Sequence, residues 1–180
     1  MNMKPINKLL AVAFCATAFA ATAAITKAEH KTAVGDAEMA YKRAMATCAT
    51  LAGHAKDVCV SESKAERVYA VAKTDGEYKN TPKAVFDGRK QVAKAEYDLA
   101  KTKCDAKAGN DKDVCVKEAQ AIEVRALEDA KASNAISDAR ADASTAKNTA
   151  NYKVALEKCD AFSGDTKGTC VKNAKASFNK

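Results

Sequence analysis

The stretch Tyr97–Lys117, YDLAKTKCDAKAGNDKDVCVK, contains a motif that occurs three times in this 180-residue chain. The shared pattern is Tyr-x6-Cys-x4-Gly-x5-Cys-Val, and successive copies lie 55 or 56 residues apart. The repeated positions are Tyr41, Tyr97 and Tyr152; Gly53, Gly109 and Gly164; and Cys48, Cys59, Cys104, Cys115, Cys159 and Cys170. A fixed period marks a repeated supersecondary unit. The chain is therefore expected to contain three copies of one local structure.

The half of each copy before the glycine predicts an amphipathic helix. Tyr41, Ala44 and Cys48 step by three and four, so the tyrosine and the first cysteine share one helical face, which we call the seam. The glycine is expected to end this helix in a left-handed conformation. Asn110 and Asp165 directly follow two of the glycines and are expected to cap the second helix. The predicted unit is an antiparallel helical hairpin.

The two cysteines of each copy lie five residues before and six after the glycine, at matched heights on facing helices. A disulfide requires Cα atoms about 4.4–6.8 Å apart, and small residues such as Ala44 on the seam allow that approach. The predicted bonds are Cys48–Cys59, Cys104–Cys115 and Cys159–Cys170. Free buried thiols are one alternative. A zinc or copper site is another, although no histidine occupies a repeated position to complete its ligands.

The N-terminal 24 residues predict a cleaved signal peptide. Lys4 and Lys8 precede a short apolar core, and A-x-A cleavage sites follow it. The core is shorter than the roughly 20 residues of a membrane span, so no transmembrane anchor is expected after cleavage. Cys15 offers a lipoprotein alternative, which the bulky Phe14 before it disfavours. Export would supply the oxidising compartment that three disulfides need.

The repeat divides the chain into four segments. These are the signal peptide at 1–24 and three hairpins at 25–76, 77–136 and 137–180. The turn-rich stretch Thr74–Pro82 predicts a linker between the first two hairpins, with Thr81 as the cap and Pro82 as the first residue of the next helix.

The junction of the second and third hairpins has no such signal. Residues 111–163 contain neither glycine nor proline, so one helix of about 50 residues or two shorter ones would fit. Polar Thr145 and Asn148 occupy seam positions of the third copy. We therefore expect two helices with a kinked or frayed junction, near Ser133-Asn134 or Ser144-Thr145.

No motif in the chain indicates catalysis. There is no glycine-rich phosphate loop, paired-histidine motif or nucleophile elbow, and His30 and His54 are expected to be single surface residues. The cysteine pairs lack the Cys-x-x-Cys spacing of redox thiols. The repeated tyrosines are expected to be core spacers. The sequence thus predicts a non-enzymatic protein without a cofactor or a metal.

The net charge and the distribution of charged residues limit the kinds of partner that the chain is expected to bind. The net charge is +7, which loss of Lys4 and Lys8 would lower by two, and basic and acidic residues are interspersed. This mixture is typical of solvated helix faces. Together with the signal peptide it argues against a nucleic-acid partner, while the excess of positive charge favours weak contact with anionic envelope surfaces.

The motif Tyr-x6-Cys-x4-Gly-x5-Cys-Val-Lys, in an alanine- and lysine-rich exported chain, resembles periplasmic proteins of Gram-negative bacteria with repeated Cys-x10-Cys hairpins, some of them labelled Tol-like. The resemblance covers most of the mature chain, and the first copy departs from it at His54 and Ser61. It implies architecture and no activity. We expect a structural or interaction protein of the periplasm that binds an envelope protein or itself. The alternative is a thiol-based metal-binding or redox-responsive protein.

Overall fold

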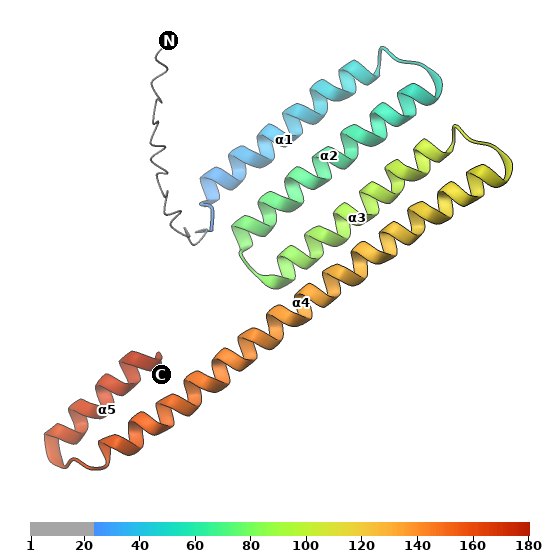
Figure 1. Ribbon diagram of the computed structural model, residues 1–180. Helices are drawn as coiled ribbons and strands as arrows, with labels where there is room; N and C mark the ends of the chain where they lie inside the picture. The colour runs from blue at the N-terminus through green and yellow to red at the C-terminus, as the bar shows by residue number, and fades with distance from the viewer. Residues whose placement is uncertain (1–23) are drawn as a thin grey trace, which may run out of the picture.

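Good helix formers fill most positions between the turns, and they form five α-helices in the computed structural model, which describes residues 24–180. The helices are α1 (Lys27–Cys48), α2 (Gly53–Lys79), α3 (Pro82–Cys104), α4 (Gly109–Cys159) and α5 (Gly164–Phe178) (Figure 1). No strand occurs in residues 24–180. The predicted all-α class with three disulfide-stapled antiparallel hairpins is confirmed. The predicted signal peptide falls on residues 1–23, outside the described residues, and on Ala24.

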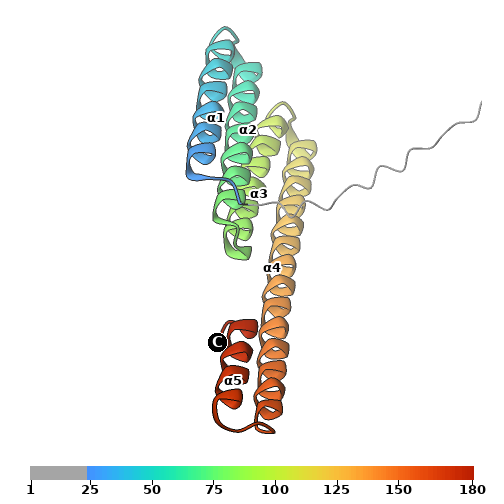
Figure 2. The same ribbon diagram turned by 90° about the vertical axis from the view of Figure 1, so that its left-hand side faces the viewer.

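The helices form a single layer. Within residues 24–180, α1 packs on α2, α2 on α3, α3 on α4 and α4 on α5, and no other pair of helices is in contact. Figure 1 shows α1 to α3 and the first half of α4 side by side, and Figure 2 shows α4 running on beyond them to carry α5. Residues 24–180 place no second layer of helices over this one, so both faces of the layer are free of other helices from this part of the chain.

The buried core is correspondingly thin. In the described residues, the buried apolar side chains are five alanines and three cysteines, namely Ala72, Ala93, Ala119, Ala130, Ala174, Cys48, Cys104 and Cys159. Burial stabilises at about 25 cal/mol per Å² of apolar surface, so alanines contribute little each. Larger apolar side chains such as Tyr69, Ile122 and Ile136 remain more than half exposed. The hairpins therefore depend strongly on their covalent staples.

The turn between the first two hairpins differs from the prediction. The stretch Thr74–Pro82 is helical up to Lys79, and only Asn80 and Thr81 lie outside α2 and α3. Asn80 ends α2 in the left-handed conformation, with φ 45°. Gly76, a residue of the expected linker, is buried against Val85 of α3, and this packing outweighs its low helix propensity. Thr81 caps α3 and Pro82 opens it, as predicted.

The long second junction also differs from the prediction. No break occurs near Ser133-Asn134 or near Ser144-Thr145, and α4 continues for 51 residues, so the predicted boundary between 136 and 137 lies inside a helix. The polar side chains there bond within the helix. Asn134 Nδ2 donates to Asp138 Oδ2 at 2.8 Å, and Ser137 Oγ donates to the Ser133 carbonyl at 3.0 Å. The Asn134–Asp138 bond is an i,i+4 side-chain pair of the kind that supports a helix, and residues 111–159 of α4 contain neither glycine nor proline.

Candidate interaction surface

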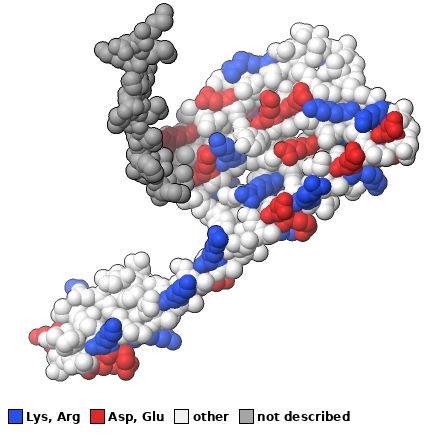
Figure 3. Space-filling view, viewed as in Figure 1, with Lys and Arg blue, Asp and Glu red and all other residues white. Residues whose placement is uncertain are grey.

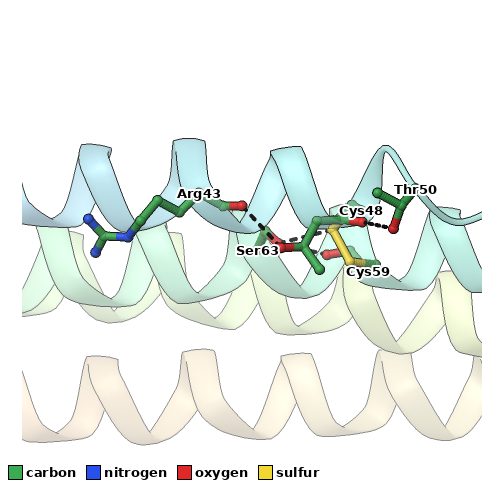
Figure 4. Close-up of a disulfide and its surroundings, with 6 residues drawn as sticks. Arg43, Cys48, Thr50, Cys59 and Ser63 are labelled. Carbon is green, nitrogen blue, oxygen red and sulfur yellow. Dashed lines mark hydrogen bonds between the residues drawn. A yellow bond between two sulfur atoms is a disulfide. The ribbon is translucent and has the colours of Figure 1, made fainter.

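The three cysteine pairs staple the three hairpins at their turns. The Cα atoms are 5.5 Å apart in Cys48–Cys59, 5.7 Å in Cys104–Cys115 and 5.6 Å in Cys159–Cys170. In the first staple, Ser63 Oγ donates to the Cys59 carbonyl at 2.8 Å and lies 3.5 Å from Cys48 Sγ (Figure 4). The first cysteine of every pair is at most 1% exposed. These bonds are positioned as structural links inside the hairpins.

The repeated glycines lie at the start of the second helix of each hairpin. Gly53, Gly109 and Gly164 all have φ +56°, as their predicted left-handed conformation requires. The first helix, however, ends at the cysteine, and a four-residue turn separates it from the glycine. The expected caps are also wrong. Asn110 and Asp165 lie inside the first turns of α4 and α5, and neither helix has a side-chain cap.

An ion pair accompanies the staple in two of the hairpins. Lys112 Nζ lies 2.8 Å from Asp105 Oδ1, and the equivalent Lys167 Nζ lies 2.9 Å from Asp160 Oδ1. Its hydrogen bond to Lys112 holds the pKa of the Asp105 carboxyl below its usual value. The first hairpin has Ala49 in place of the aspartate. The Cys-Asp dipeptide shared by the second and third copies is the sequence signal for this ion pair.

The repeated tyrosines lie half-buried on their hairpins with different neighbours. The Arg67 guanidinium stacks 4.9 Å from the ring centre of Tyr41, and Lys94 Nζ is 5.1 Å from that of Tyr97. The ring centre of Tyr152 lies 6.0 Å from that of Phe178 in α5. The structure does not bring the three tyrosines into one site, because each belongs to its own hairpin.

A groove opens on one face of the layer, across α2, α3 and the first half of α4. Its volume is about 950 Å³. Alanines and glycines, including Ala72, Gly88 and Ala93, form its floor, while Tyr69 and Val92 add larger apolar surface. Charged residues also line it, namely Lys73, Glu77, Arg89, Glu96 and Asp129. Sequence reasoning missed this groove because it depends on how the hairpins pack together.

Several titratable side chains in residues 24–180 form ion pairs. His30 Nε2 lies 2.7 Å from Asp75 Oδ1 and joins the start of α1 to the end of α2, so His30 is not the single surface residue expected. This hydrogen bond lowers the pKa of Asp75. Within residues 24–180, no three His, Cys, Asp or Glu side chains gather in a way that could hold a metal ion. Basic and acidic side chains are mixed over the face in Figure 3.

None of the helices in residues 24–180 has the length and apolar character to cross a membrane. No family model, curated protein or solved structure matches this chain. Its function is therefore inferred from its own residues.

Proposed function

We propose that this protein is an exported, non-enzymatic helical repeat protein of the periplasm, with a structural or protein-interaction role in the cell envelope. The observation that carries the proposal is the open layer of stapled hairpins. Ten large apolar side chains are exposed on the described residues, whereas only alanines and cysteines are fully buried among the apolar ones. An extended helical surface that leaves large apolar side chains exposed, instead of burying them in its own core, is suited to binding other proteins.

The location follows from the disulfides and the N-terminal sequence together. Three disulfides require an oxidising compartment. The predicted signal peptide would deliver the chain there, with cleavage between Ala20 and Lys27. The intact mass of protein purified from the periplasm tests this step. A product that retains Met1, or that carries a lipid on Cys15, would contradict it.

The interaction role is tested by affinity capture from an envelope fraction with the mature protein as bait. We expect Tyr69→Glu, which places a charge beside the apolar floor of the groove, to remove a captured protein that wild type retains. Phe162→Glu is the matched control, because Phe162 is also exposed but lies at the α4–α5 turn. Identical captures with all three baits would exclude the groove as the binding face.

Thiol counting separates this proposal from the thiol-based alternative. We expect no free thiol and no bound metal in natively purified protein, because both partners of each pair are consumed in a disulfide. Reactive thiols that appear without denaturation, or copurifying zinc or copper, would favour the metal-binding or redox-responsive function instead.

A further inference from the structure

The contact between α2 and α3 joins the first hairpin to the second. Ser61 Oγ lies 3.0 Å from Thr102 Oγ1, and Lys103 Nζ lies 2.8 Å from Glu62 Oε1. A Cβ on Gly88 would lie 3.3 Å from the Cβ of Ala72, and one on Gly76 would lie 3.6 Å from Cγ2 of Val85. These four pairs define what we call the inter-hairpin interface.

The repeat predicts a second inter-hairpin interface, between the second hairpin and the third. Residues of α2 have equivalents 56 positions later and residues of α3 have equivalents 55 positions later, as the cysteines show. The equivalent pairs are Lys117 with Glu157, Glu118 with Lys158, Glu128 with Ala143, and Ala132 with Arg140. All eight residues are exposed. Since α4 is continuous, both halves of this interface lie on one helix and cannot meet within the chain.

The unformed interface is complementary in charge. Glu118 and Lys158 keep the residue types of the Glu62–Lys103 ion pair. Lys117 and Glu157 replace the Ser61–Thr102 hydrogen bond with opposite charges. These four charged residues form no ion pair within residues 24–180.

An apolar strip joins the two halves of the interface. Ala132, Ile136, Ala139 and Ala143 step by four, three and four residues and are exposed, Ile136 to 52%. Ala132 lies two residues after Ala130, which is buried on the α3 side, and thus about 200° around the helix. Figure 1 shows α3 and α5 on the same side of α4. No other helix of residues 24–180 packs on the opposite side, which carries the strip.

We propose that α4 pairs antiparallel with α4 of a second copy of this chain through that strip. The two-fold axis passes near Ile136, so Glu118 of each copy meets Lys158 of the other, and Lys117 meets Glu157. Each copy then adds its third hairpin to the other's layer, as the second hairpin adds to the first. This is an exchange of identical elements between two chains. The proposal rests on the proposed interaction role and names one partner for it.

A second copy fits the strip better than the chain's own third hairpin. Folding back within one chain would require α4 to break near Ile136. With the 55-residue spacing of α3 carried back through the turn, Asn80-Thr81-Pro82 correspond to Ala135-Ile136-Ser137, which lack the proline and the left-handed asparagine of the first turn. The Asn134–Asp138 hydrogen bond also spans this point. The helix therefore stays intact and its outer side is available in trans.

The test is sedimentation equilibrium of the mature protein and of two matched variants, in each of which one alanine of α4 is replaced by glutamate. We expect a dimer that Ala139→Glu weakens at least about tenfold in Kd, because two like charges would meet near the axis. Ala141→Glu makes the same change about 200° away on the same exposed turn and should leave the dimer intact. Circular dichroism checks that both variants keep their helicity.

Reversing the charges of one predicted ion pair is an independent test of the dimer. Glu118→Lys should weaken the dimer, and adding Lys158→Glu should restore it, because the pair is remade across the interface. A monomeric wild type, or a dimer equally sensitive to Ala139→Glu and Ala141→Glu, would overturn the proposal. A monomer would leave the envelope-capture test of the proposed function standing, so the two can fail separately.

Discussion

Cys48, Cys104 and Cys159 are the largest side chains buried almost completely in residues 24–180. In most helical proteins leucine or phenylalanine would occupy such positions. Here each buried sulfur is half of a bond that closes a loop with a sequence separation of 11. A disulfide that closes a loop of this length stabilises the folded state by roughly 3 kcal/mol, because it restricts the unfolded chain. At the residue scale, covalent closure takes over part of the role that apolar packing usually has.

The third staple should matter most. Replacing Cys159 and Cys170 together by alanine is expected to destabilise α5 by roughly 3 kcal/mol, because among the helices of residues 24–180 this 15-residue helix packs only on α4. Hydrogen exchange should show α5 losing protection before the rest of the chain. The matched change at Cys48 and Cys59 should have a smaller local effect, since α1 also has the His30–Asp75 pair. Equal loss of protection in both hairpins would contradict this ranking.

Asp75 gives the first hairpin an acid-sensitive contact. Its pKa is lowered mainly by the hydrogen bond to His30, so this stabilisation is present above the unfolded pKa and is lost as pH falls below about 4. Asp75→Asn should lower the free energy of unfolding at pH 7 by about 0.2–1 kcal/mol, since the pair is partly exposed. Urea unfolding at pH 7 and pH 3 measures this. Asp36→Asn, at an exposed site of α1, is the control. If wild type and Asp75→Asn differ in free energy of unfolding by the same amount at pH 7 and at pH 3, the contact does not stabilise the protein as described.

At the element scale, Gly88 sets how closely α3 approaches α2. A Cβ there would lie 3.2 Å from the Ala72 carbonyl oxygen, whereas no neighbouring group in residues 24–180 lies within 4 Å of one on Gly35. We expect Gly88→Leu to destabilise the protein by about 1–3 kcal/mol through overpacking. Gly35→Leu should instead stabilise it slightly, because leucine is the better helix former. Thermal unfolding of both variants compares them, and a stabilised Gly88→Leu would mean that the two helices do not meet there.

The accuracy of the sequence-based predictions also varies with the range of the interaction. The hairpins, the disulfide pairing and the left-handed glycines were predicted because each follows from residues less than a dozen positions apart. The linker at Thr74–Pro82 was misjudged because Gly76 is held in α2 by Val85 of the next helix. The break expected in α4 was wrong because polar seam residues were given more weight than the absence of any helix-breaking residue. Contacts between hairpins, and the groove that they form, could not be predicted, because they depend on residues of different copies of the motif.

At the scale of the whole molecule, one difference between the two junctions determines the shape. Asn80-Thr81-Pro82 turns the chain and stacks the second hairpin on the first. At the next junction the helix continues, and the third hairpin extends away from the layer (Figure 2). Similar repeats thus give a compact pair of hairpins and one projecting arm. Because this turn is missing from α4, the two halves of the second inter-hairpin interface lie on one helix and cannot meet within the chain.

Installing that turn in α4 should therefore convert the proposed dimer into a closed monomer. The triple variant Ala135→Asn, Ile136→Thr and Ser137→Pro copies the first turn at the equivalent positions. Proline inside a helix costs about 3 kcal/mol, which favours a break there. The third hairpin can then fold back onto its own second hairpin, with Lys158 beside Glu118 of the same chain. Small-angle scattering should show a shorter maximum dimension and half the wild-type mass. A variant that remains elongated, or that keeps the wild-type dimer mass, would show that the inter-hairpin interface does not recur at this junction.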